Sequence, residues 1–315
     1  LGIPELRDAI ADDYRSRFGT NIESSRIAVT SGASGALNLL SSVLLNPGDQ
    51  VLMSDPGYPC NEAFVRLVGG EPIRMPVDES TGYQPTVETV KEDWTADTVG
   101  VILATPSNPT GALIQTAQLE AINDFVVERQ GFVMVDEIYQ GLVYEPGMDE
   151  VATTSLAIDS ELIVVNSFSK YFGMTGWRLG WCVVPDLLIE PLERAAQNLY
   201  IAPSAVAQYA ALAAYSREGF RVSEERRLRF QRRRDLMYEG LLDAGLGVPL
   251  KPEGACYLYA NISSAGIDAE TFSARLLEEY QVAVTPGTDF GSYRAQDHVR
   301  FAYTANEQDI RRGLE

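Results

Sequence analysis

Lys170 is the residue whose surroundings in the sequence best suit covalent chemistry. The chain has three lysines, of which Lys91 lies in an acidic predicted helix and Lys251 in a predicted loop. Lys170 instead follows a predicted buried strand, within Ser167-Phe168-Ser169-Lys170. Desolvation there would lower the pKa of the amine, and an unprotonated amine attacks carbonyl groups. The alternative is a lysine on the surface at the end of a strand.

Two further features suit the binding of charged groups near this lysine. The segment Ser31-Gly32-Ala33-Ser34 is a turn of small residues at the predicted start of a helix, where backbone N–H groups can bind an anion. Ser167, Ser169 and Arg178 are expected to complete a phosphate site there. Asp136 ends a run of apolar residues, so its carboxylate needs a cationic or N–H partner. The alternative for Asp136 is a cap of the next helix.

The elements predicted around these residues alternate between strands and helices. Short continuous apolar runs are typical of strands that are buried on both faces of a sheet. These runs are residues 27–30, 51–53, 99–104, 132–135, 162–165 and 179–184. Helices are predicted between them, among which 33–45 and 116–129 each place apolar residues on one face. The alternation predicts an α/β fold with a mostly parallel sheet covered by helices.

The residues that follow five of these strands are small, polar, aromatic or charged. Ligands of parallel α/β sheets bind outside the carboxyl ends of the strands. We therefore expect one crevice to collect residues from segments 31–35, 55–58, 107–111, 136–139 and 167–170.

The pattern changes after about residue 215. A long charged helix is predicted over residues 222–243, followed by short strands at 256–260, 282–285 and 299–304 and a helix at 271–280. We interpret residues 221–315 as a smaller α+β domain, which begins with the long helix. Residues 1–220 form the large domain in this interpretation.

The composition argues against several classes of protein. With 25 basic and 44 acidic residues, the net charge of −19 argues against nucleic acid or an anionic membrane surface as a partner. The sequence has no run of 18 apolar residues, so it predicts no membrane-spanning helix. Three cysteines make no disulfide framework, which favours a reducing, cytoplasmic location. The single histidine, His298, has no visible partners for a metal site. The basic run of arginines in 226–234 is surrounded by Glu224, Glu225, Asp235 and Glu239, which favours a salt-bridged helix face over a nucleic-acid site.

Taken together, these segments resemble the class I/II aminotransferases, which are pyridoxal-phosphate enzymes with the aspartate-aminotransferase fold. The matching segments are Gly2–Arg7, Asn46–Asp49, Ser107–Gly111, Asp136–Tyr139, Ser167–Lys170, Gly176–Gly180 and Val299–Phe301. They follow the order of the family along essentially the whole chain. The resemblance implies a large domain with a mostly parallel seven-stranded sheet covered by helices, and a smaller α+β C-terminal domain.

The activity implied by the resemblance is the transfer of an amino group from an L-amino acid to a 2-oxo acid. The cofactor would be pyridoxal 5'-phosphate, which alternates between its pyridoxal and pyridoxamine forms. Two chains would form a homodimer with shared active sites. A partner tyrosine that binds the phosphate and an N-terminal arm have no match here, and we expect their segment to precede Leu1.

The resemblance also implies a role for each site residue. Lys170 would bind the cofactor covalently and later carry a proton between the substrate Cα and the cofactor, while Asp136 would keep the pyridine nitrogen protonated. Tyr58 would stack on the ring. The phosphate would be held by the backbone N–H groups of Ala33 and Ser34, the hydroxyls of Ser167 and Ser169, and the guanidinium of Arg178. The phenolic oxygen would be bound by Tyr139 and Asn108, and the substrate by Arg300 and Asn108.

Alternatives with the same fold stay open at this point. They are a C–S lyase, a cyclopropane-forming synthase, or the aminotransferase-like domain of a transcriptional regulator. The sequence has no match for the second arginine that binds an acidic side chain, which argues against an aspartate-specific enzyme.

Overall fold

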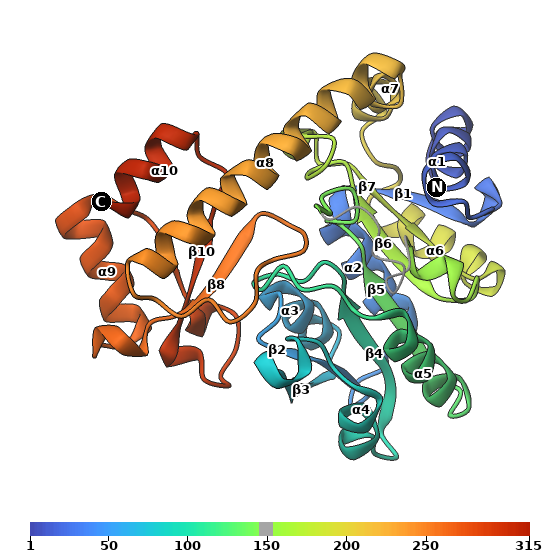
Figure 1. Ribbon diagram of the computed structural model, residues 1–315. Helices are drawn as coiled ribbons and strands as arrows, with labels where there is room; N and C mark the ends of the chain where they lie inside the picture. The colour runs from blue at the N-terminus through green and yellow to red at the C-terminus, as the bar shows by residue number, and fades with distance from the viewer. Residues whose placement is uncertain (145–153) are drawn as a thin grey trace.

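The larger of two β-sheets has seven strands in the order β1-β7-β6-β5-β4-β2-β3 (Figure 1). The computed structural model describes residues 1–144 and 154–315. The strands are β1 (Ile27–Thr30), β2 (Gln50–Asp55), β3 (Glu71–Pro76), β4 (Thr98–Ala104), β5 (Phe132–Asp136), β6 (Ile163–Ser167) and β7 (Gly180–Val183). Strand β7 runs antiparallel to β1 and β6, and the other pairings are parallel. The mostly parallel seven-stranded sheet is confirmed.

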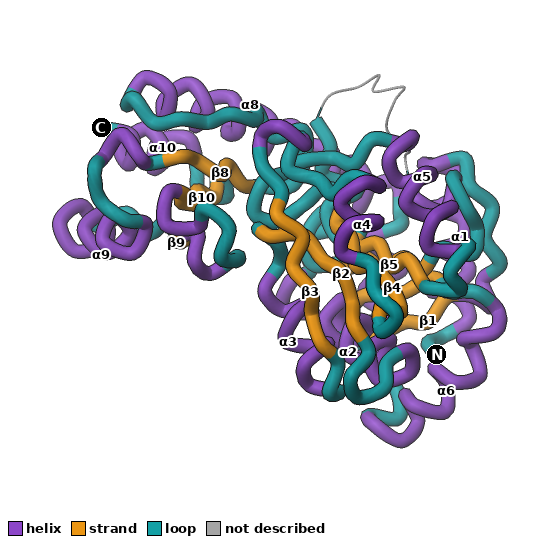
Figure 2. The backbone as a smooth tube through the Cα atoms, turned by 90° about the horizontal axis from the view of Figure 1, so that it is seen from below, coloured by secondary structure: helices purple, strands orange, loops and turns teal. Residues whose placement is uncertain are grey.

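Helices cover both faces of this sheet, and the alternation of side chains along the strands explains why. In β4, Val101 and Leu103 pack in one apolar cluster and Ile102 in the other. The helices around this sheet are α1 (Pro4–Phe18), α2 (Gly32–Leu44), α3 (Pro59–Leu67), α4 (Val87–Asp93), α5 (Thr116–Val127), α6 (Asp186–Leu199) and α7 (Ala205–Ala214). Helices α1, α4 and α5 lie on one side of the strands, and α2, α3 and α6 on the other (Figure 2). Both faces of the strands are therefore apolar.

The second sheet is small and antiparallel, with β10 (His298–Ala302) between β8 (Tyr257–Asn261) and β9 (Thr285–Pro286). It packs with α9 (Ala269–Tyr280). Helix α10 (Glu307–Leu314) packs on the long helix α8 (Arg217–Asp243), which extends from α7 to this group (Figure 1). The predicted salt-bridged face of α8 is present, since Arg227 pairs with Glu224 at 2.9 Å. None of the helices in residues 1–144 and 154–315 combines the length and apolar content needed to cross a membrane.

The differences from the expected elements have local causes. Strand β3 was not expected, because it contains two prolines and is largely exposed, as only an edge strand tolerates. Of the expected strand at 282–285, only Thr285 is in a strand, the two-residue β9, because only Thr285 and Pro286 pair with β10. Helix α8 begins at Arg217, five residues earlier than expected, because the Ser216 hydroxyl caps it by accepting from the Gly219 N–H at 3.1 Å.

Candidate active site

One cavity of about 200 Å³ lies at the carboxyl ends of the parallel strands, where it is closed from one side by β8 and β10. All the site residues expected from the sequence line it: Ala33, Ser34, Tyr58, Asn108, Asp136, Tyr139, Ser167, Ser169, Lys170, Arg178 and Arg300. The cavity is also lined by Ile138 of the expected segment 136–139, and by residues that lie outside the expected segments: Leu37, Ala104, Pro106, Thr175 and Tyr257. The strand ends thus converge as expected, and the cavity collects residues from both sheets.

An anion would be favoured at the end of the cavity where α2 begins. Gly32 opens this helix with φ +75°, and a Cβ atom on it would lie 2.8 Å from Nη2 of Arg178. The guanidinium is therefore held directly against the helix N-terminus. Arg178 donates to the Thr175 carbonyl oxygen at 3.0 Å, and no carboxylate in residues 1–144 or 154–315 forms an ion pair with it. A cation without a counter-ion beside the free N–H groups of a helix attracts an anion such as a phosphate.

The hydroxyls of Ser167 and Ser169, at the same end of the cavity, differ in their hydrogen bonds within the chain. The Ser167 hydroxyl donates to the Leu179 carbonyl at 3.2 Å and accepts from the Ser169 N–H at 3.0 Å, so it shapes the turn. The Ser169 hydroxyl has no hydrogen-bond partner within the described part of the chain. Of the two hydroxyls, that of Ser169 is the one available to a ligand.

Gly180 on β7 lets α2 approach the strand, because a Cβ atom on Gly180 would lie 2.7 Å from the backbone nitrogen of Ala33.

Asp136 is buried at the bottom of the cavity, at the end of β5. Its Oδ1 accepts from the Ile138 N–H at 3.0 Å. Burial raises the pKa of this carboxyl to about 6, although the Ile138 N–H and the charge of Lys170 act to lower it. The residues after Asp136 form a turn, so the alternative of a helix cap is wrong. A protonated nitrogen in the cavity would supply the partner that this carboxylate lacks.

Lys170 follows β6 and is half-buried, which is more exposed than the sequence suggested. Its Nζ lies 5.2 Å from the ring centroid of Tyr139. No carboxylate of the described residues lies within ion-pair distance of this amine. Tyr139 is buried, and its hydroxyl shares a hydrogen bond of 3.0 Å with that of Tyr257. The amine therefore faces the cavity beside a buried phenol.

Arg300 enters the cavity from the small sheet. Its Nη1 donates to Oδ1 of Asn108 at 2.9 Å and its Nη2 to the Thr285 hydroxyl at 3.3 Å. The guanidinium carbon lies 4.1 Å from the ring centroid of Tyr257 and 4.6 Å from that of Phe290. Its Nε is buried and has no hydrogen-bond partner among the residues that the structure describes. A guanidinium with neutral neighbours and unused donors suits a bidentate carboxylate.

Residues 287–294 hold the small sheet against the end of β2. The buried carboxylate of Asp55 accepts from the Ser292 N–H at 3.0 Å and from the Tyr293 N–H at 3.2 Å. The Gly57 N–H donates to the Phe290 carbonyl at 2.9 Å, next to Tyr58. His298 stacks on Tyr259 with ring centroids 4.8 Å apart, outside the lining of the cavity. These contacts fix the position from which Arg300 reaches the cavity.

Comparison with known proteins gives a consistent set of relatives. The family described as aminotransferase class I and II matches residues 1–315. The chain is 35% identical over 314 residues to a valine–pyruvate aminotransferase of Mycobacterium tuberculosis, covering 100% of this chain and 80% of that protein. It is 34% identical over 316 residues to an aspartate/prephenate aminotransferase of Thermus thermophilus, covering 100% of this chain and 80% of the relative.

Solved structures agree with these relatives. The crystal structure of an aminotransferase from Mycobacterium tuberculosis superposes with a TM-score of 0.95 at 35% identity, over 100% of this chain and 80% of that one. The aspartate aminotransferase of Thermus thermophilus with maleate gives a TM-score of 0.92 at 34% identity, over 99% of this chain and 80% of that one. The architecture is therefore shared with both.

Proposed function

The chain belongs to the class I and II aminotransferases, and from that membership we propose that its cavity binds pyridoxal 5'-phosphate. The enzyme moves an amino group from an amino acid to a 2-oxo acid. The relatives named above are aminotransferases, so the lyase, synthase and regulator alternatives are not favoured. The observation that carries the proposal is the convergence of Lys170, Asp136, Arg178 and Arg300 on one cavity.

The phosphate group fits the end of the cavity where α2 begins. The backbone N–H groups of Ala33 and Ser34, the Ser169 hydroxyl and the Arg178 guanidinium would hold it. The support is the unpaired guanidinium, which lies against the helix N-terminus. Ser167 would contribute to phosphate binding indirectly, because its hydroxyl accepts from the Ser169 N–H and so orients the backbone of Ser169.

Tyr58, which lines the cavity, would stack on the ring of the cofactor. When bound, this cofactor supplies a conjugated ring that withdraws electrons from the bonds of the substrate Cα. Asp136 would hold the proton on the ring nitrogen, because among the described residues its buried carboxylate accepts from a single N–H group, that of Ile138. Tyr139 and Asn108 would bind the phenolic oxygen. Lys170 would bind the cofactor carbon covalently with loss of water and, once the substrate amine has displaced it, its free amine would move a proton at the substrate Cα.

Arg300 and Asn108 would bind the substrate. The two nitrogens of the guanidinium fork match the two oxygens of an α-carboxylate. Asn108 already accepts from Arg300, so it holds the guanidinium plane in place. Because Arg300 comes from the small sheet, binding of the carboxylate would connect the two sheets across the cavity and exclude water.

We further propose an amino donor with an uncharged side chain. The cationic side chains that line the cavity, within the described residues, are Lys170, Arg178 and Arg300. Each already has a role, and the remaining wall near Arg300 is aromatic, with Tyr58 and Tyr257. An acidic side chain would lack a counter-charge there.

The assembly and location belong to the same proposal. A homodimer with shared active sites is supported by exposed apolar side chains around the start of α7, where Ile201 is 80% and Val206 71% exposed. Sedimentation over a dilution series should give a dimer at micromolar concentration.

The proposed division into a large domain, residues 1–220, and a small domain, residues 221–315, rests on the two separate sheets. The free thiols Cys60, Cys182 and Cys256 support a cytoplasmic location.

A single half-reaction tests the proposed activity. Enzyme loaded with pyridoxal 5'-phosphate is mixed with one amino acid and no 2-oxo acid acceptor. Transfer predicts one equivalent of 2-oxo acid per site and no free ammonia, because the amino group stays on the cofactor. With an amino acid that carries a leaving group on Cβ, such as an S-alkyl cysteine, repeated turnover with release of pyruvate, ammonia and the thiol would contradict transfer and favour a lyase.

A further inference from the structure

Tyr257 lies between Arg300, which would bind the substrate carboxylate, and Tyr139, which would bind the cofactor. It begins β8, is 8% exposed and lines the cavity. In the pairing of β8 with β10, Tyr257 lies opposite Ala302 and Tyr259 opposite Arg300. Tyr257 is therefore a diagonal neighbour of Arg300 on the same face of the small sheet. The guanidinium carbon lies 4.1 Å from the centroid of its ring, a cation–π contact.

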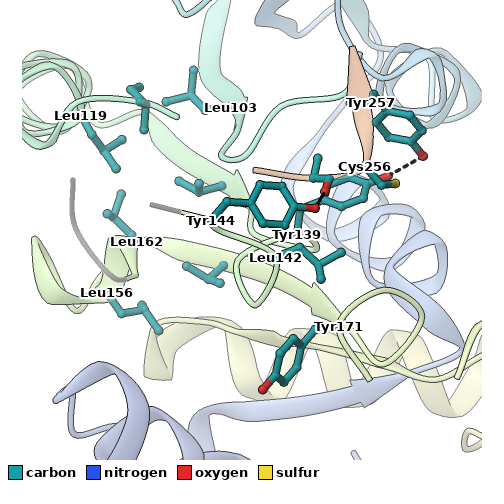
Figure 3. Packing of buried hydrophobic residues seen from close by; sticks show 14 of the residues in the cluster. Leu103, Leu119, Tyr139, Leu142, Tyr144, Leu156, Leu162, Tyr171, Cys256 and Tyr257 are labelled. Atoms are coloured by element: carbon teal, nitrogen blue, oxygen red, sulfur yellow. Dashed lines mark hydrogen bonds between the residues drawn. The ribbon is translucent and has the colours of Figure 1, made fainter. Parts of the chain in front are cut away.

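The hydroxyl of Tyr257 reaches the other sheet. It shares a hydrogen bond of 3.0 Å with the hydroxyl of Tyr139, and the two rings meet edge to face at 5.8 Å between centroids (Figure 3). Tyr139 in turn lies 5.2 Å from Nζ of Lys170, measured from the centroid of its ring. One continuous set of contacts thus leads from Arg300 through Tyr257 and Tyr139 to Lys170.

The number of protons decides which tyrosine donates when the cofactor is bound. Burial raises the pKa of Tyr257 to about 12 and that of Tyr139 well above its ordinary value, so each keeps one hydroxyl proton near neutral pH. If Tyr139 donates its proton to the phenolic oxygen, it can only accept from Tyr257. A hydroxyl that accepts one hydrogen bond is a stronger donor in the next, because the two bonds polarise each other.

We propose that Tyr257 is a positioning residue for amino transfer. Its hydroxyl donates to Tyr139 and strengthens the hydrogen bond from Tyr139 to the cofactor, while its ring holds the Arg300 guanidinium in the orientation that receives the carboxylate. The inference rests on the proposed function. It adds a residue from the small sheet that serves both ends of the site.

Tyr257→Phe separates the hydroxyl from the ring. The measured quantity is the pH midpoint at which the visible absorption of the bound cofactor changes, in the loaded enzyme without substrate. Loss of the donor to Tyr139 weakens the stabilisation of the negative phenolic oxygen and favours protonation of the imine nitrogen. The midpoint should therefore rise, by roughly 0.3 pH unit or more. The ionisable groups that face the two tyrosines are Tyr58, Asp136, Lys170, Cys256 and Arg300, and none is changed.

Tyr257→Leu removes the ring as well. Acetate serves as a bare carboxylate probe, and its dissociation constant is read from the same absorption. Tyr257→Phe should bind acetate within about twofold of the native enzyme, and Tyr257→Leu should bind it roughly fivefold or more weakly. Unchanged acetate affinity in Tyr257→Leu would overturn the role of the ring.

Tyr303→Phe is the matched control. Tyr303 is also buried, and its hydroxyl donates to the carbonyl of Ala255 at 3.2 Å, but it does not line the cavity. It should lower the thermal unfolding temperature without moving the pH midpoint. Equal midpoints in Tyr257→Phe and the native enzyme would overturn the role of the hydroxyl. A native enzyme without visible absorption, or without any response to acetate, would instead contradict the proposed function.

Discussion

The side chains of Arg300 and Asn108 meet across the cavity, with Nη1 of Arg300 donating to Oδ1 of Asn108 at 2.9 Å. Arg300 lies on β10 of the small sheet, and Asn108 follows β4 of the large one. The partner of the guanidinium is thus a neutral amide, so its positive charge stays available to a substrate carboxylate.

We predict that Arg300→Lys weakens the binding of the amino acid. A lysine ammonium cannot replace the planar fork that meets two carboxylate oxygens. Loss of one charge-assisted hydrogen bond should reduce kcat/KM roughly 10- to 100-fold, mostly through KM. The visible spectrum of the bound cofactor should stay the same. Arg294→Lys is the control, because Arg294 pairs with Glu79 outside the cavity lining, and an unchanged KM in Arg300→Lys would point to another carboxylate site.

Asp136→Ala should keep part of the cofactor and lose most of the activity. Without the carboxylate, the ring nitrogen is deprotonated and withdraws electrons less strongly. We expect kcat to fall more than about 100-fold, which corresponds to roughly 2.7 kcal/mol or more in the barrier. Single-turnover kinetics with saturating amino acid measure the loss. Near-normal turnover would show that Asp136 serves only the local turn.

Gly32→Ala should weaken the binding of the phosphate. The residue has φ +75°, and the new Cβ atom would lie 2.8 Å from Nη2 of Arg178, so the guanidinium has to move. The dissociation constant of pyridoxal 5'-phosphate should rise roughly tenfold or more, as expected for loss of a charged hydrogen bond. That of pyridoxal, which lacks the phosphate, should change little.

Gly19→Ala is the matched control for this variant. Gly19 also has a positive φ, +66°, but no atom of residues 1–144 or 154–315 lies within 4 Å of the added Cβ atom. It introduces a similar backbone strain far from the cavity and should leave the affinity for the cofactor unchanged. Equal affinities for pyridoxal 5'-phosphate in Gly32→Ala and Gly19→Ala would contradict the phosphate site.

Glu137 should make the stability of the cofactor-free protein depend on pH. This fully buried carboxyl accepts from the Thr154 hydroxyl at 2.9 Å, and burial raises its pKa to about 7. Because this pKa is above that of the unfolded chain, the folded state binds more protons, and stability is lost as the pH rises toward 7. Glu137→Gln should therefore match the native protein at pH 4 and exceed it at pH 8 by roughly 1–3 kcal/mol.

Urea unfolding between pH 4 and pH 8 measures this difference. Glu278→Gln, at an exposed position of α9, is the control and should follow the native curve. A constant offset between Glu137→Gln and the native protein at all pH values would show that the carboxyl keeps one protonation state throughout.

A strand or a site residue can be predicted from the sequence when its own residues and their neighbours in the chain determine it. Strand β4 is readily predicted because the side chains on both of its faces are apolar, whereas β3 is an exposed edge strand with two prolines and has no such pattern. Asp136 and Lys170 follow buried strands, and the geometry of parallel sheets brings such positions together. Tyr257 gives no local signal, because its place in the cavity depends on the pairing of β8 with β10 and on the docking of the small sheet. The hydrogen bond from the Ser167 hydroxyl to the Leu179 carbonyl cannot be predicted from the sequence either, because the two groups meet only in the folded chain.

Borohydride reduction tests the proposed covalent bond between Lys170 and the cofactor. The reagent reduces the carbon–nitrogen double bond of the bound cofactor to a stable bond, and peptide mapping then locates the modified lysine. We expect stoichiometric modification of Lys170 and none of Lys91 or Lys251, the other two lysines of the chain. Modification of Lys91 or Lys251 with Lys170 unmodified would contradict it.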